Sequence, residues 1–199
     1  MTSQCPTSPE LLQEGIALAK EGKLAEAQDC FERCLRNNPR VVAAQHNLAV
    51  VLARRKQLDA AVVAFLKTIE LDPQFGDAHG NLGLAYYEQG RIDEAVDEFH
   101  KALKLGPGSA ETYNNLGAAR MQQARPNDAE AAYRAALQIK PDYAEAHLNL
   151  ARALLIQGHF DEGWLEYEWR AKCTDALPRH WRQPRWAGET LAGRTVLVH

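Results

Sequence analysis

The sequence predicts an all-α fold, a right-handed superhelical solenoid of stacked antiparallel helix pairs. Three observations predict it: a 34-residue repeat, apolar residues at helical spacing in both halves of each repeat, and glycine or proline at the joints. Four repeat positions stay in register over four or five copies, which leaves little room for coincidence. They hold Ala27, Ala61, Ala95 and Ala129; Leu48, Leu82, Leu116 and Leu150; Pro39, Pro73, Pro107 and Pro141; and Phe31, Phe65, Phe99, Tyr133 and Tyr167.

Each repeat is predicted to form two amphipathic helices. The first half of the third repeat places Leu82 and Tyr86 four residues apart, and its second half places Ile92, Ala95 and Phe99 at spacings of three and four. Residues at these spacings share one face of a helix, so each half can bury an apolar stripe against the other.

Glycine and proline mark the ends of the predicted helices. Gly22, Gly90 and Gly158 follow the first helix, where a left-handed backbone is favourable without a Cβ atom. The prolines between repeats cannot donate a helical hydrogen bond, so they end the second helix. Each repeat is therefore expected to be a helical hairpin.

Three further glycines lie inside the predicted first helices, namely Gly15, Gly83 and Gly117. Glycine in a helix interior costs about 1 kcal/mol relative to alanine. We therefore expect a close approach of the partner helix at these positions, which Ala49 and Ala151 fill in the other two repeats.

The repeat divides the chain into a short tail, five units and a C-terminal extension. Residues 1–7 are expected to be a flexible tail. The five units are 8–41, 42–75, 76–109, 110–143 and 144–177. The fifth unit departs from the others, with Gly163, Arg170 and Asp175 where alanine, a small residue and proline belong. Its second helix is therefore expected to end the array differently.

Several residues of the third unit carry a family resemblance. Leu82, Gly83, Tyr86, Ala95, Phe99, Ala102 and Pro107 match the tetratricopeptide repeat pattern almost completely. This resemblance implies a protein-binding or peptide-binding module with a concave face lined by the first helices, because such hairpins bury their apolar faces only by stacking.

An asparagine also recurs every 34 residues, one position before the repeated leucine. Asn47, Asn81, Asn115 and Asn149 form what we call the asparagine ladder. The ladder resembles the inner surface of the repeats in O-linked N-acetylglucosamine transferase, which implies that these amides hold extended polypeptide. A structural role, in which each amide links neighbouring helices, is weighed equally.

Four apolar residues are placed on the same groove face, where they could take ligand side chains. They are Leu84, Tyr87, Met121 and Leu155. Packing between repeats is the favoured alternative for each of them, because apolar stripes usually belong to a core.

Charge and hydropathy limit the partners. The net charge is −3, and residues 170–194 hold six Lys or Arg against Asp175 and Glu189, so the repeats are acidic. Nucleic acid is not expected along an acidic body, because phosphate binding needs a basic surface. No apolar run approaches the roughly 20 residues of a membrane span, so a cytoplasmic protein without a membrane partner is expected.

No catalytic residue, metal site or cofactor is expected. Cys30 and Cys34 share a helix face but lack the further ligands that zinc requires. His79 and His147 share one repeat position with Gln45 and Tyr113, which indicates helix packing. The chain is therefore not expected to be an enzyme by itself.

The C-terminal extension differs in composition from the repeats. All four tryptophans, Trp164, Trp169, Trp181 and Trp186, lie in the last 36 residues. The run from Gly163 to Arg194 resembles the join in bacterial proteins that fuse these repeats to a glycosyltransferase-like domain. That resemblance implies a linker and a first strand of an α/β domain over 178–199, in a chain that is part of a longer one. The alternative is a true end, with Trp164 and Trp169 capping the last repeat.

Three functions follow in order of preference. The first is a scaffold that holds extended polypeptide along its groove. The second is the N-terminal part of a glycosyltransferase-like enzyme whose catalytic domain is missing here. The third is self-assembly into a homo-oligomer, in which the basic extension of one molecule enters the acidic groove of another.

Overall fold

The computed structural model describes residues 7–106 and 108–173, and this part of the chain is built from helices joined by short turns. The predicted residues 178–199 and their strand lie outside the described residues. The helices are α1 (Ser8–Lys20), α2 (Leu24–Asn37), α3 (Val42–Arg54), α4 (Leu58–Leu71), α5 (Gly76–Glu88), α6 (Ile92–Leu105), α7 (Ala110–Gln122), α8 (Pro126–Ile139), α9 (Ala144–Ile156), α10 (Phe160–Tyr167) and α11 (Arg170–Cys173).

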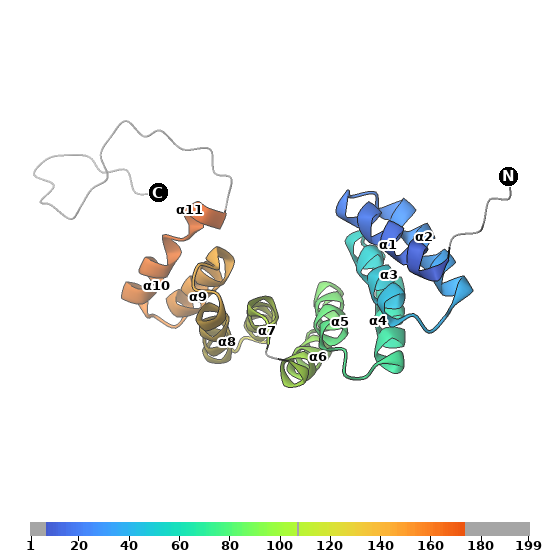
Figure 1. The fold of residues 1–199 in the computed structure, drawn as a ribbon. Coiled ribbons are helices and arrows are strands. Elements are labelled where there is room, and N and C mark those ends of the chain that lie inside the picture. The colour runs from blue at the N-terminus through green and yellow to red at the C-terminus, as the bar shows by residue number, and fades with distance from the viewer. Residues whose placement is uncertain (1–6, 107, 174–199) are drawn as a thin grey trace, which may run out of the picture.

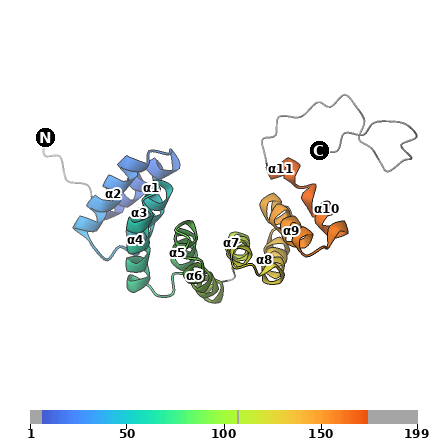
Figure 2. The same cartoon turned by 180° about the vertical axis from the view of Figure 1, so that it is seen from behind.

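The helices form five consecutive antiparallel pairs that stack into an open arch (Figure 1). Each first helix (α1, α3, α5, α7, α9) packs on its own second helix, and α3, α5, α7 and α9 also pack on the second helix of the preceding pair. In Figures 1 and 2 the first helices α5 and α7 lie on the inner side of the arch, and α6 and α8 lie on the outer side. The predicted solenoid of helix pairs is thus confirmed.

All five turns within the pairs have a residue with left-handed backbone conformation at the same repeat position. Gly22, Gly90 and Gly158 have φ of 80°, 77° and 83°, as predicted. Lys56 and Ala124 hold the equivalent position with φ of 60° and 55°, although an L side chain is unfavourable there. One repeated hydrogen bond closes each turn; in the third pair the Arg91 N–H donates to Tyr86 O at 2.9 Å. This bond pattern is that of a Schellman motif.

Close approach of an aromatic ring explains the glycines inside the first helices. A Cβ atom on Gly83 would lie 2.8 Å from the ring of Phe99, and one on Gly117 would lie 2.5 Å from the ring of Tyr133. Gly15 stands in the same relation to Phe31, at 2.6 Å. The expected close contact between the two helices of a pair is confirmed, and its partner is the aromatic ring of the second helix.

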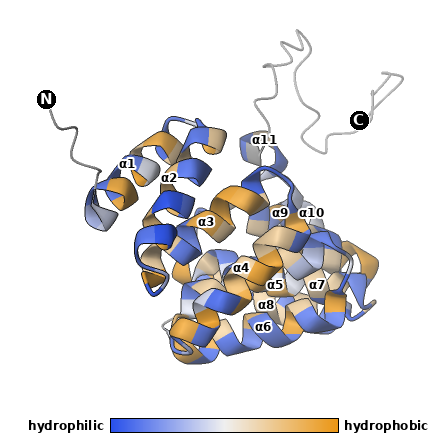
Figure 3. Cartoon of the chain, turned by 90° about the vertical axis from the view of Figure 1, so that its right-hand side faces the viewer, coloured by the Kyte–Doolittle hydropathy of each residue, from blue (hydrophilic) through white to orange (hydrophobic). Residues whose placement is uncertain are grey.

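The core runs along the arch between the first and second helices. Its fully buried large side chains include Phe31, Phe65, Phe99 and Tyr133, one from each of the first four pairs. Figure 3 shows hydrophobic and hydrophilic residues mixed along the helices, as expected where only one face is buried. None of the helices in the described part of the chain is both long and apolar enough to cross a bilayer.

The fifth pair departs from the pattern, as predicted. Its second helix α10 has 8 residues instead of 14, and the short helix α11 follows and packs on α9. Trp169 stacks on His147 of α9, with ring centroids 3.8 Å apart. Trp164 is 58% exposed. Of the two tryptophans expected to cap the array, Trp169 covers α9, the first helix of the fifth pair. The expectation that Trp164 also caps the array is wrong, because most of its side chain is exposed.

Candidate functional site

The four residues of the asparagine ladder lie on α3, α5, α7 and α9, the helices of the inner side. All four are half-buried. Each asparagine directly precedes the repeated leucine in the sequence. Because consecutive side chains of a helix point in different directions, the amide lies beside the leucine stripe, at the border between the packed interface and the groove.

Two of the four amides link neighbouring pairs. The Asn81 side-chain N–H donates to Nε2 of His46 on the preceding first helix at 3.1 Å. The Asn149 side-chain N–H donates to Oδ1 of Asn114 at 3.0 Å. Both bonds join residues 35 positions apart, so they are the same contact two repeats apart along the array.

The other two amides lack this link because their neighbours cannot provide it. The residues 35 positions before Asn47 and Asn115 are Leu12 and Gly80, which carry no polar side-chain group. Asn47 instead donates to the Ala43 carbonyl of its own helix at 2.8 Å. Asn115 makes no side-chain hydrogen bond within the described residues, so its donor and acceptor are available to a ligand.

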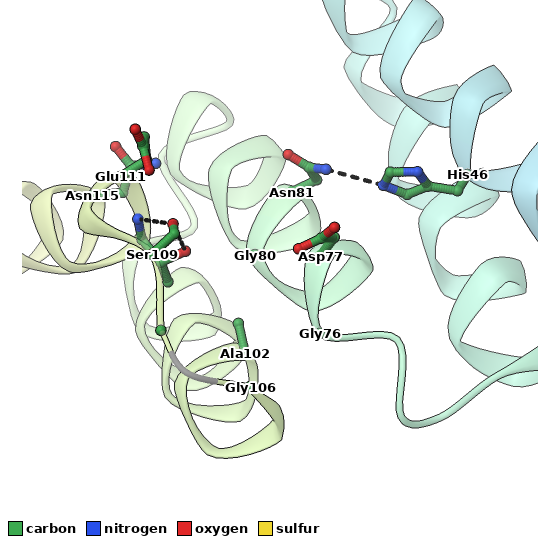
Figure 4. Close-up of a pocket in the computed structure, with 12 residues that line it drawn as sticks. His46, Gly76, Asp77, Gly80, Asn81, Ala102, Gly106, Ser109, Glu111 and Asn115 are labelled. Atoms are coloured by element: carbon green, nitrogen blue, oxygen red, sulfur yellow. Dashed lines mark hydrogen bonds between the residues drawn. The ribbon is translucent and has the colours of Figure 1, made fainter. Parts of the chain in front are cut away.

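A cleft of about 380 Å³ is lined by residues of α3, α5, α6 and α7, and we call it the inner cleft. Asn81 and Asn115 both line it, together with His46, Asp77, Glu111 and Thr112. Figure 4 shows Asn81 and Asn115 rising from adjacent first helices, with Gly80 and Ser109 between them. Its volume falls within the range of about 300–1,000 Å³ that is usual for ligand sites.

The charge in the inner cleft is negative at neutral pH. Asp77 and Glu111 are exposed carboxylates, and the lining includes no lysine or arginine. Burial lowers the pKa of His46, and the charge of Asp77 opposes this only in part. His46 is therefore neutral at pH 7, which is the form whose Nε2 can accept from Asn81.

The four apolar groove candidates all pack against buried residues. Leu84 and Tyr87 are half-buried and pack against the central cluster, and Met121 packs against the cluster that contains Tyr133. Leu84 also lines a second hollow of about 420 Å³ between α3 and α5. Leu155 packs on Gly163, and a Cβ atom built on Gly163 would lie 2.9 Å from Cδ2 of Leu155. Each side chain thus packs between helices, while its half-burial leaves part of it to the surface.

The histidines at the shared repeat position do pack between the helices of a pair. Nδ1 of His79 donates to Glu98 Oε2 at 2.6 Å, and both side chains are buried. His147 makes the same bond to Glu166. Within the described residues, no group of three or more His, Cys, Asp or Glu is placed to hold a metal ion.

Cys30 and Cys34 are buried and free. Burial raises the pKa of the Cys30 and Cys34 thiols, so both are protonated at neutral pH. A protonated, buried thiol is a poor nucleophile, and these residues act as small core side chains.

The repeat pattern alone did not indicate a role for His46, Asn114 or the two carboxylates of the inner cleft. Asn114 is 2% exposed, and its side-chain oxygen accepts a hydrogen bond from the Asn149 amide. The available signal was the 35-residue spacing of His46 from Asn81 and of Asn114 from Asn149.

Family comparison agrees with the geometry. Four overlapping models of the tetratricopeptide repeat match residues 12–74, 64–97, 83–123 and 120–163. The chain belongs to the tetratricopeptide repeat family. No curated protein matches this tetratricopeptide repeat chain.

Several solved structures share the tetratricopeptide fold. A structure of PilF from Pseudomonas aeruginosa has a TM-score of 0.77 at 22% identity, over 84% of this chain and 76% of that one. MamA has a TM-score of 0.72 at 22% identity, over 79% and 92%. YrrB, described as a TPR protein with an unusual peptide-binding site, has a TM-score of 0.64 at 23% identity, over 71% and 73%. Identities this low establish the fold alone.

Proposed function

We propose that this tetratricopeptide repeat chain is a scaffold that holds an extended polypeptide along its inner side. The observation that carries the proposal is the inner cleft, which is lined by amides of two consecutive repeats, Asn81 and Asn115. An amide donates and accepts, so it can bind a peptide backbone of any sequence.

The spacing of the helices suits an extended ligand. Packed helices lie about 8–10 Å apart, and an extended chain rises about 3.3 Å per residue. One ladder amide would therefore meet every third ligand residue. A structural neighbour, YrrB, is described as having a peptide-binding site, which supports this role for the fold.

The hydrogen bonds of the ladder divide its members into two kinds. Asn81 and Asn149 already serve the interface between repeats, so their loss would change both stability and binding. Asn115 has no internal partner in the described part of the chain and lines the inner cleft. It is therefore the ladder residue that can act on a ligand alone.

Magnitudes show that the ladder does not act by itself. A net hydrogen bond contributes about 0.5–1.5 kcal/mol, so four contribute roughly 2–6 kcal/mol, and micromolar binding needs about 8 kcal/mol. Side-chain contacts must add the remainder. Leu84 and Tyr87, which are half-buried on α5, are the groove residues proposed for that part.

The test measures affinity and stability in the same variants. Peptides would be selected from a random library displayed on phage, with the full chain as bait, and their affinity measured by fluorescence anisotropy. We expect Asn115→Ala to weaken binding about two- to tenfold, the loss of one hydrogen bond, without lowering the melting temperature. If affinity is unchanged both in Asn115→Ala and in the variant with all four ladder asparagines replaced by alanine, the ladder has a structural role only.

A further inference from the structure

Three carboxylates share one position at the start of the first helices on the inner side. Asp77, Glu111 and Glu145 lie 34 residues apart in the first turns of α5, α7 and α9, and all three are exposed. We call them the acidic row. The equivalent residues of the first two repeats are Pro9 and Ala43, so the row belongs to the third, fourth and fifth repeats.

A carboxylate in the first turn stabilises a helix through the helix dipole, so position alone does not indicate a ligand. The surroundings of Asp77 and Glu111 provide a separate reason to expect a ligand at these two carboxylates. Both line the inner cleft beside Asn81 and Asn115, the amides proposed to hold a peptide backbone. The acidic row therefore flanks a site of suitable volume and hydrogen-bonding capacity.

The two charges in the inner cleft are weakly compensated. Asp77 makes no hydrogen bond or ion pair to another side chain in the described residues, and Glu111 has only Lys140 at 3.9 Å, with both side chains about half exposed or more. Exposed pairs of this kind contribute little. The pKa of His46, the nearest basic group of the lining, is lowered by burial, so its neutral ring does not offset the charge.

The third carboxylate is more engaged. Glu145 accepts from the Tyr143 hydroxyl at 3.4 Å and lies 3.5 Å from the Asn114 side-chain nitrogen. Asp77 and Glu111 are therefore the two carboxylates of the acidic row that line the inner cleft.

We infer that the inner cleft selects an extended segment of a partner protein that carries a lysine or arginine. The cation lies between Asp77 and Glu111 while Asn115 holds the adjacent backbone. This inference rests on the proposed function and adds the class of ligand. The selectivity comes from the charges, and the ladder provides contacts that any sequence can make.

The test uses the random library selected on the full chain. We expect the selected peptides to be enriched in lysine and arginine relative to the starting library. The double variant Asp77→Asn, Glu111→Gln removes both charges with little change of shape. It should bind these peptides about four- to sixteenfold more weakly, because each exposed pair contributes about two- to fourfold. Added salt should weaken the wild type more than the variant.

The matched control removes the same charge from the outer helices. Glu70 on α4 and Asp97 on α6 are exposed and have no side-chain hydrogen bond or ion pair in the described part of the chain. The variant Glu70→Gln, Asp97→Asn should retain wild-type affinity. Equal losses in the two double variants would show an effect of net charge only, and would overturn the inference.

Two further outcomes separate the inference from the function beneath it. Peptides that lose affinity in Asn115→Ala but show no basic enrichment would overturn the inference and leave the proposed function standing. Peptides insensitive to both the asparagine and the carboxylate variants would overturn both. A synthetic peptide of residues 177–188, with Arg179, Arg182 and Arg185, that binds as tightly as the selected peptides would assign the inner cleft to a second copy of this chain instead.

Discussion

The side chain of Asn81 on α5 is bonded to Nε2 of His46 on α3 at 3.1 Å, across the interface between the second and third repeats. The stability of a stacked array is the sum of repeat and interface contributions, so this bond acts on one interface. Asn81→Ala should lower the free energy of unfolding by about 0.5–1.5 kcal/mol, because it leaves half-buried His46 unpaired. Urea unfolding followed by circular dichroism measures the change.

Asn115 is the matched control for that variant. It occupies the same repeat position on α7 and has no side-chain hydrogen bond within the described residues. Asn115→Ala should change the unfolding free energy by less than about 0.5 kcal/mol. Equal losses in Asn81→Ala and Asn115→Ala would contradict the division of the ladder into bonded and free members.

His46 should make the stability depend on pH below neutrality. Burial lowers its pKa in the folded state, so the unfolded chain binds a proton more readily as the pH falls through about 6.5. Stability contributed by the neutral ring is therefore fully present above that pH and is lost below it. Thermal unfolding between pH 7.5 and 5 should show the decrease.

The variant His46→Asn isolates this effect. It retains an amide partner for Asn81, as in the Asn114–Asn149 pair, and removes the titrating group. The pKa of His100 is also lowered by burial, but His100 is present in both proteins. The pH dependence should be shallower in His46→Asn, and identical slopes would exclude His46 as the cause.

The turn between α7 and α8 should be improved by glycine. Ala124 is exposed and has φ of 55°, where an L side chain costs about 1–2 kcal/mol. After the flexibility of glycine in the unfolded chain is allowed for, Ala124→Gly should stabilise the chain by about 0.5–1 kcal/mol. Gly90→Ala, at the equivalent turn, should destabilise it by a similar amount. A stabilised Gly90→Ala variant, detected as a higher urea midpoint, would contradict the account of the turns.

The glycine inside α7 should resist replacement. A Cβ atom on Gly117 would lie 2.5 Å from the Tyr133 ring, and overpacking costs about 1–3 kcal/mol. Alanine recovers about 1 kcal/mol of helix propensity, so Gly117→Ala should destabilise by about 1 kcal/mol net. Calorimetry would show a lower melting temperature, whereas an increase would mean that the ring moves without cost.

The 34-residue repeat could predict the helix pairs because helical hairpins impose the same requirements on every copy. Glycine at the turn, an aromatic residue opposite the internal glycine and apolar residues at spacings of three and four all follow from local geometry. Gly83 and Phe99 illustrate this, since the small residue and the ring are each visible in the sequence and meet in the structure.

The partners of the ladder could not be predicted from the repeat alone. The hydrogen bond that each ladder asparagine can make depends on the residue 35 positions before it. Along the array that residue is Leu12, His46, Gly80 and then Asn114. The repeated asparagines therefore suggested four equal roles, whereas the structure gives them three different sets of contacts. The His79–Glu98 bond was missed similarly, although His147 and Glu166 show the same 19-residue spacing.

The most direct test of the account is solution NMR of the chain with a selected peptide. The side-chain amide of Asn115 and the backbone amides of α3, α5 and α7 should shift on titration, and Asn115 should show contacts to the peptide backbone in nuclear Overhauser spectra. Shifts confined to the outer helices α4, α6 and α8, with the Asn115 amide unchanged at saturation, would contradict a polypeptide site on the inner side.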